Sequence, residues 1–169
     1  MPQTVESPSR SLAFIEVRRV HKAALASGRA QLAALLGFDL PDQWPAFPEA
    51  FDPDSPDPAT PEWPAYFFVS PERGLVVGNG GYCGAPRHGE IEIGYEVAPA
   101  FRRQGFATAA VAWLMARAFA APAIQSVIAH TLAERNASNS VLIKSGMSFV
   151  GAYPNNEVGT IWRWRKARA

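Results

Sequence analysis

The chain has 169 residues, of which 48% are hydrophobic and 18% are charged, and its formal net charge is +1. Because this length fits one compact domain, two independent catalytic domains are excluded. The composition excludes wholesale disorder. No run reaches the roughly 18 apolar residues of a membrane span, and the net charge excludes the overall basicity of a nucleic-acid binder.

The cysteine content and the first residues favour a reducing compartment. Cys83 is the only cysteine, which excludes an intrachain disulfide and a cysteine metal cluster. The N-terminal segment MPQTVESPSR lacks the basic start and apolar core of a secretory signal. We therefore expect a cytoplasmic protein in which residues 1–11 form a flexible polar arm and residues 12–169 form the domain.

The first elements follow from local composition. Residues 12–20 are rich in β-branched and aromatic side chains, which is typical of a strand. Residues 21–36 are rich in alanine and leucine at near-helical spacing, and Gly37 is placed to end that helix.

The segment 41–64 concentrates both proline and negative charge. It contains eight of the fifteen prolines and no lysine or arginine, and its charge is −6 from the acids Asp42, Glu49, Asp52, Asp54, Asp57 and Glu62. Proline interrupts helices and interior strands. We therefore predict a long loop inserted in the domain, with one short helical turn near residues 47–51, docked by the aromatic residues Trp44, Phe47, Phe51 and Trp63.

Strands follow the loop. Residues 66–69 and 75–77 flank a turn and predict an antiparallel hairpin. Residues 90–97 alternate most regularly, so that one face carries Ile91, Ile93, Tyr95 and Val97 and the other carries Glu90, Glu92, Gly94 and Glu96.

After Pro99 the apolar period changes to that of a helix, which Pro122 ends. The remaining elements are a strand at 126–131, a short helix at 138–145 and a hairpin of residues 147–152 and 159–165. The helical crossover between strands 90–97 and 126–131 makes that pair parallel. The sum is a single α/β (α+β) domain with a mixed, mostly antiparallel sheet.

The strand-to-helix junction at residues 96–115 carries the chemistry. Gly105 turns the chain into a helix whose first N–H groups have no intrahelical partner. With Arg102 and Arg103 beside it, this helix terminus suits a pyrophosphate. The junction lacks the lysine and Ser/Thr of a P-loop and the three glycines of a dinucleotide fingerprint.

Residues 102–107, Arg-Arg-Gln-Gly-Phe-Ala, fit the acetyl-coenzyme A signature Gln/Arg-x-x-Gly-x-Gly/Ala. With EIEIGYEVAPAFR before it and ERNASNSVLIKSGMSFVG after it, the sequence resembles the GNAT superfamily of N-acetyltransferases over residues 75–164. The resemblance is strongest to the ribosomal-protein N-terminal acetyltransferase branch. It implies a sheet whose parallel pair is splayed around the coenzyme, with helices on both faces.

The resemblance also implies an acetyl-CoA site and no metal. The pyrophosphate would bind backbone N–H groups of the signature, and the pantetheine arm would pair with the end of strand 90–97 and with an asparagine after the fifth strand of the family fold. Either asparagine candidate could instead cap a helix. The cofactor-binding residues so implied are Val97, Arg102, Arg103, Gln104, Gly105, Phe106, Ala107 and Asn136, with Asn139 as the alternative to Asn136.

The candidate base is Glu92. It shares a strand face with Glu90 and Glu96, and three carboxylates on a shielded face raise one another's pKa. The alternative base is His130 on the neighbouring strand. Ordinary ion pairs on a solvated face are the competing interpretation of the glutamates.

The candidate proton donor is Ser138. Many GNAT members protonate the departing thiolate with a tyrosine, and Leu142 occupies that position here. Ser140 and unaided departure of the thiolate are the alternatives to Ser138, which would otherwise cap a helix.

These features predict an acetyl-CoA-dependent N-acetyltransferase in which a primary amine attacks the thioester directly in a ternary complex. The acceptor remains open among a protein N-terminus, an amino acid, a polyamine and an antibiotic. The alternatives are a non-catalytic acyl-CoA binding or sensing module and a nucleic-acid binder that uses the basic C-terminal residues. We expect a monomer or homodimer with no nucleic-acid or membrane partner, and an acidic loop 41–64 that walls the acceptor side and attracts a cation.

Overall fold

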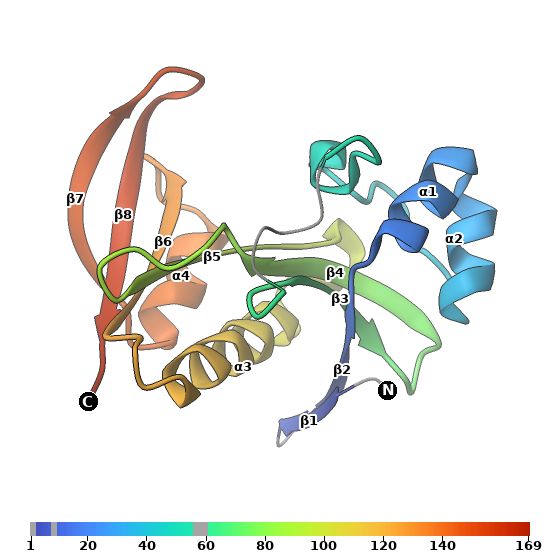
Figure 1. The fold of residues 1–169 in the computed structure, drawn as a ribbon, viewed down its shortest axis with the longest axis horizontal. Helices are drawn as coiled ribbons and strands as arrows, with labels where there is room; N and C mark the ends of the chain where they lie inside the picture. The colour runs from blue at the N-terminus through green and yellow to red at the C-terminus, as the bar shows by residue number, and fades with distance from the viewer. Residues whose placement is uncertain (1–2, 8–9, 56–60) are drawn as a thin grey trace.

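The computed structural model describes residues 3–7, 10–55 and 61–169. Figure 1 shows a curved sheet that carries helices on both faces. In chain order the elements are β1 (Gln3–Ser7), β2 (Arg10–Glu16), α1 (Arg19–Ser27), α2 (Arg29–Leu36), η1 (Pro48–Phe51), β3 (Ala65–Ser70), β4 (Leu75–Tyr82), β5 (Glu90–Val97), η2 (Pro99–Phe101), α3 (Phe106–Ala120), β6 (Ser126–Leu132), α4 (Ala137–Lys144), β7 (Ser148–Asn155) and β8 (Gly159–Ala167).

The sheet has eight strands in the order β1-β2-β3-β4-β5-β6-β8-β7. Strands β5 and β6 are parallel, with α3 as the crossover between them, and the other neighbouring pairs are antiparallel. The predicted α/β fold with one parallel pair is confirmed. No helix among the described residues is long and apolar enough to cross a membrane.

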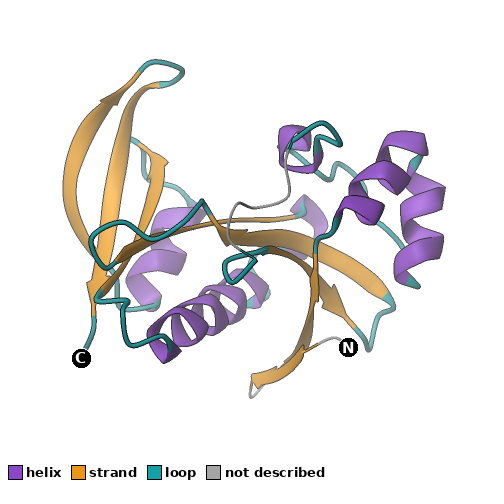
Figure 2. Ribbon diagram, viewed as in Figure 1, coloured by secondary structure: helices purple, strands orange, loops and turns teal. Residues whose placement is uncertain are grey.

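Strand alternation divides the buried side chains between two cores. On one face Phe68, Ile91 and Ile93 pack against α3 and α4, around the fully buried Leu114. On the other face Phe67 belongs to a second cluster, to which α1, α2 and the acidic loop contribute side chains. Figure 2 shows the two groups of helices on opposite sides of the sheet. The predicted helices on both faces are confirmed.

The N-terminal region differs from the prediction in two ways. The arm expected over residues 1–11 contains β1, which pairs antiparallel with β2. The single helix expected over residues 21–36 is two helices, because Gly28 has φ 155° and interrupts the helical backbone. Gly37, at φ 76°, ends α2 as predicted.

The acidic loop is anchored to the domain by aromatic side chains. Trp44, Phe51 and Trp63 are buried, and η1 is the predicted helical turn. Phe47 is 59% exposed, so its predicted role as a fourth anchor is wrong. Asp57 of the predicted acidic group lies outside the described residues.

Candidate active site

Strands β5 and β6 are paired over only part of their length. The pairing runs from Glu90↔Ser126 to Glu92↔Ile128. Beyond that point β5 continues against β4 alone and β6 against β8 alone. The sheet therefore opens between β5 and β6, which is the splay that the family resemblance implied.

The open edge of β5 presents backbone groups to this opening. The carbonyl of Glu92 and the N–H of Ala98 both bond to the β4 side, at Cys83 and Val77. Because backbone groups alternate along a strand, those of the odd-numbered residues Ile93, Tyr95 and Val97 face the opening.

A pocket of about 630 Å³ lies between the start of α3 and the start of α4. Gly105, with φ 84°, occupies the left-handed region immediately before α3, where a glycine carries no Cβ penalty. The pocket is lined by Val97, Phe101, Arg102, Arg103, Gly105, Phe106, Ala107, Thr108, Arg135, Asn136, Ala137, Ser140, Val141 and Lys144.

Positive charge gathers around this pocket, which we call the basic pocket. Arg102, Arg103, Arg135 and Lys144 line it, and none of the described lining residues is acidic. The positive end of the α3 dipole adds to the same field. Such an arrangement binds an anion such as a pyrophosphate.

Most of the predicted coenzyme residues line the pocket, but Gln104 and Asn139 do not. The Gln104 side chain donates to the carbonyl of Ala100. Asn139 is buried, and its side chain donates to the carbonyl of Glu134. Asn136 lines the pocket and also caps α4, since its Oδ1 accepts the N–H of Asn139 at 3.1 Å.

The three glutamates of β5 do not act as one repelling group, and Glu90 fits the competing interpretation of ordinary ion pairs. Glu90 accepts hydrogen bonds from Ser126, at 2.9 Å, and from Arg163 and Arg165. Burial acts to raise the pKa of Glu90, but these partners outweigh it and the pKa is lowered. Glu90 is thus a structural ion-pair residue.

Glu92 has a different partner. His130 Nδ1 lies 2.8 Å from Glu92 Oε1, and each side chain keeps a quarter to a third of its surface exposed. The two candidate bases that the sequence offered as alternatives are therefore in direct contact.

Glu96 fastens the acidic loop to the sheet. Its Oε2 accepts the backbone N–H of Ala46 at 3.0 Å. Burial raises the pKa of Glu96, and the N–H groups of Ala46 and Phe47 offset part of that rise. The other carboxylate oxygen is buried and has no hydrogen-bond partner among the described residues.

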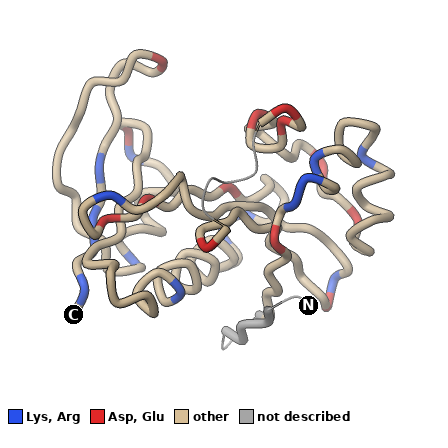
Figure 3. Tube along the Cα trace, in the orientation of Figure 1, with Lys and Arg blue, Asp and Glu red and all other residues tan. Residues whose placement is uncertain are grey.

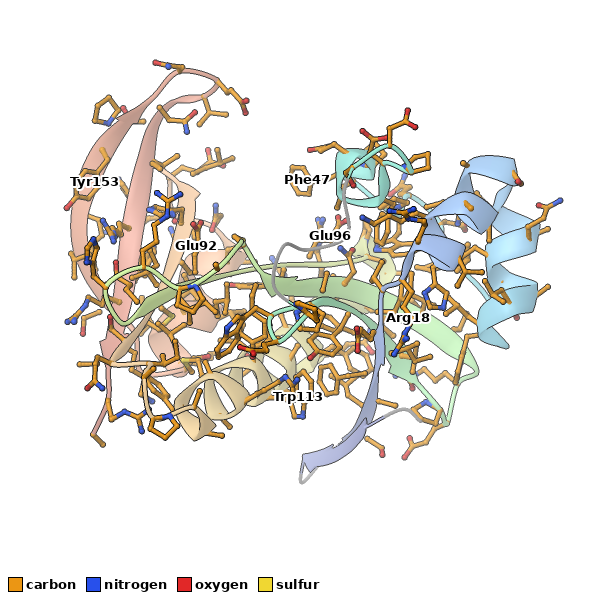
Figure 4. All side chains as sticks on the ribbon, viewed as in Figure 1. Arg18, Phe47, Glu92, Glu96, Trp113 and Tyr153 are labelled. Atoms are coloured by element: carbon orange, nitrogen blue, oxygen red, sulfur yellow. The ribbon has the colours of Figure 1, made fainter. Side chains whose placement is uncertain are left out.

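A second pocket, of about 540 Å³, lies on the glutamate face of the sheet. Figure 4 shows Glu92 and Glu96 on the side of β5 opposite α3, between Phe47 of the acidic loop and Tyr153 of β7. We call this second pocket the glutamate-face pocket; its lining residues are Cys83, Gly84, Ala85, Arg87, His88, Glu90, Glu92, Ile128 and Arg163. Cys83 is exposed, yet local desolvation and the charge of Glu92 raise the pKa of its thiol to about 12, which disfavours a thiolate nucleophile.

Residues 42–148 match a family model described as the acetyltransferase (GNAT) domain. The chain belongs to the GNAT acetyltransferase family. No curated protein is similar enough to this GNAT chain to match it.

Solved structures share the GNAT fold at low identity. Mycobacterium smegmatis RimJ in complex with CoA-disulfide is 18% identical with a TM-score of 0.67, and the match covers 98% of this chain and 86% of that chain. The microcin C7 self-immunity acetyltransferase MccE, in complex with acetyl-CoA and AMP, is 15% identical with a TM-score of 0.68 over 96% and 98% of the two chains. The ribosomal-protein-S5-alanine acetyltransferase from Vibrio fischeri is 14% identical with a TM-score of 0.67 over 98% and 96%.

The predicted proton donors of this GNAT chain lie at α4. Leu142 is fully buried in the core, and its hydrocarbon side chain cannot donate a proton. Ser140 lines the basic pocket, whereas Ser138 does not. The carbonyl of Ser138 accepts the hydroxyl of Tyr95 at 3.2 Å, so Tyr95 links β5 to α4.

Sequence reasoning missed Arg135, Lys144 and Tyr95. Arg135 and Lys144 stand in the segments ERN and IKSG, which carry part of the family resemblance. Their contribution to the pocket depends on where α4 packs against α3, and local periodicity does not reveal this. Tyr95 was assigned only to the apolar face of its strand.

Proposed function

We propose that this GNAT acetyltransferase transfers an acetyl group from acetyl-CoA to a primary amine by direct attack in a ternary complex. The observation that carries the proposal is the continuity of the basic pocket with the opening between β5 and β6. Val97 ends the open edge of β5 and also lines the basic pocket. An extended chain can therefore pass from the α3 terminus to the centre of the sheet.

The residues present fit acetyl-CoA as the donor. The first turn of α3, with Arg102 and Arg103, would bind the pyrophosphate, and Arg135 and Lys144 would add charge from the α4 side. The open backbone of β5 would pair with the pantetheine amides, and Asn136 offers a side-chain partner. RimJ in complex with CoA-disulfide and MccE in complex with acetyl-CoA support this assignment.

The amine would approach from the glutamate-face pocket, because Glu90 and Glu92 line it. A backbone N–H at the open edge of β5 would stabilise negative charge on the thioester oxygen. An α-amino group, with a pKa near 8, demands less of a base than a lysine amine near 10.4. A protein N-terminus and a small primary amine both satisfy this chemistry.

The test is release of coenzyme A thiol from acetyl-CoA in the presence of peptides with free N-termini, amino acids, polyamines and aminoglycosides. We expect release with at least one amine class and a mass gain of one acetyl group on that acceptor. If the unmutated protein releases no thiol with any of these amine classes, the enzyme proposal is overturned. Coenzyme binding without release would instead favour the acyl-CoA binding module.

The donor site is tested separately by calorimetric titration with coenzyme A. The variant Arg102→Gln/Arg103→Gln should bind at least 10-fold more weakly, since each lost charge-assisted contact contributes about 1–2 kcal/mol. A control that removes one positive charge is Arg18→Gln, because Arg18 is exposed and its ion pair with Glu16, at 3.7 Å, lies on an exposed surface. Equal affinities for the two variants would remove the pyrophosphate assignment.

A further inference from the structure

We propose that His130, held by Glu92, is the group that takes the proton from the acceptor amine, so that Glu92 acts as a positioning residue. This inference rests on the proposed function. It assigns one role to each of two residues that the sequence left as competing bases.

The contact determines which nitrogen of His130 is available. A carboxylate can only accept a hydrogen bond, so at the 2.8 Å contact the imidazole Nδ1 carries the hydrogen. In the neutral ring the lone pair is then on Nε2. Glu92 therefore selects the tautomer in which Nε2 can accept a proton.

The position of the pair relates it to the reaction. Glu92 is the last residue of β5 that pairs with β6, at Ile128. His130 lies two residues further along β6, beside the opening, on the part of β6 that pairs only with β8. The pair thus lies where the sheet opens, and Glu92 also lines the glutamate-face pocket, through which the amine would approach.

The neighbouring charges leave the pair intact. Glu90 on β5 is occupied by Arg163 and Arg165 of β8 and by Ser126 of β6. The guanidinium of Arg163 also lies 5.9 Å from the Tyr153 ring centroid on β7. The remaining charged or titratable residues that line this pocket are Arg87, His88 and Cys83. Of the two glutamates that line this pocket, Glu92 is the one that contacts His130.

The proton and electron balance is simple. The amine nitrogen forms a bond to the thioester carbon, and Nε2 of His130 takes the nitrogen's proton. The C–S bond breaks with its electron pair on sulfur. The imidazolium gives its proton to water, and the thiolate takes one from water, which restores His130 and yields the free thiol.

The first experiment measures kcat and acceptor KM for His130→Asn and Glu92→Gln with the amine found above. An asparagine amide can still donate to Glu92, so His130→Asn keeps the contact and removes the base. A glutamine at 92 removes the carboxylate charge that stabilises the imidazolium, and its amide N–H competes with its amide oxygen for Nδ1, so the tautomer with a free Nε2 is no longer enforced. We expect both variants to lose about 100-fold or more in kcat, with acceptor KM changed less than threefold.

The double variant and chemical rescue complete the test. His130→Asn/Glu92→Gln should be no slower than either single variant, because both act on one proton transfer. Added imidazole should raise the activity of His130→Ala at least tenfold. It should not raise the activity of the unmutated protein or of Glu92→Gln. Thermal unfolding and coenzyme A titration establish that each variant is folded.

Two outcomes would overturn the inference. In one, His130→Asn keeps more than half of the unmutated kcat while Glu92→Gln does not, which makes Glu92 the base. In the other, His130→Ala loses activity that imidazole does not restore. Both leave the acetyltransferase proposal standing, because the unmutated protein is active; that proposal fails only if no amine supports thiol release.

Discussion

The indole N–H of Trp44 donates to the side-chain oxygen of Asn79 at 2.9 Å, and both residues are buried. This bond joins the acidic loop to β4. Asn79→Ala leaves a buried N–H without its partner and should lower the free energy of unfolding by about 1–3 kcal/mol. Urea denaturation measures this. Adding Trp44→Phe to Asn79→Ala should cost less than Trp44→Phe costs alone; equal costs would mean that the two residues are not coupled.

Glu96 predicts a stability difference that depends on pH. Burial raises its folded-state pKa above the ordinary value of 4.5, so its favourable contribution is complete below pH 4.5 and is lost as pH rises through the folded value. The free energy of unfolding of the unmutated protein, relative to that of Glu96→Gln, should therefore be highest near pH 4 and should fall toward pH 7. Urea denaturation of both proteins across this range tests the sign of this trend. A stability of the unmutated protein that rises with pH relative to Glu96→Gln would contradict it.

Glu90 predicts the opposite trend on the same strand face. Its partners lower the folded-state pKa below 4.5, so its contribution is present above that pH and is lost as pH falls through the folded value. Relative to Glu90→Gln, the unmutated protein should be more stable at pH 7, and the difference should shrink toward pH 3. Parallel curves for the Glu90 and Glu96 variants would show that the two environments are alike.

Gly78 is required by the close approach of β4 and β5. A Cβ built on Gly78 lies 2.1 Å from the carbonyl oxygen of Glu96, whereas a Cβ on Gly37 meets nothing within 4 Å. Gly37→Ala should cost about 1 kcal/mol from its positive φ alone. Gly78→Ala should cost clearly more and lower the thermal midpoint further. Equal midpoints for the two variants would mean that the strands separate without penalty.

The acidic loop is expected to attract the acceptor. Figure 3 shows acidic residues gathered on the loop around η1. Asp52→Asn/Asp54→Asn should raise the KM of a cationic amine severalfold at about 0.01 M salt and little at about 1 M, where charges are screened. The control with the same charge change is Asp39→Asn/Glu72→Gln, at exposed positions outside the loop. An equal rise for the control would reduce the effect to net charge.

Much of the fold could be predicted because its determinants are local. The alternation of residues 90–97 and the helical stripe that begins at Ala107 each repeat with the period of the element they form. The break at Gly28 was missed because glycine is tolerated within a helical pattern, and only its φ of 155° separates α1 from α2. The strand β1 was missed because its four polar residues around a single valine carry little periodic signal.

The sequence by itself determined most of the elements and the glycine junction that starts α3, because each depends on neighbours within a few residues. The helical crossover between β5 and β6 determined their parallel pairing. Only the tertiary structure decided the partners of the three glutamates. Glu92 meets His130 38 positions away, Ala46 lies 50 positions from Glu96, and Arg163 lies 73 from Glu90. These contacts depend on strand register and on where the acidic loop docks, and periodicity along the chain encodes neither.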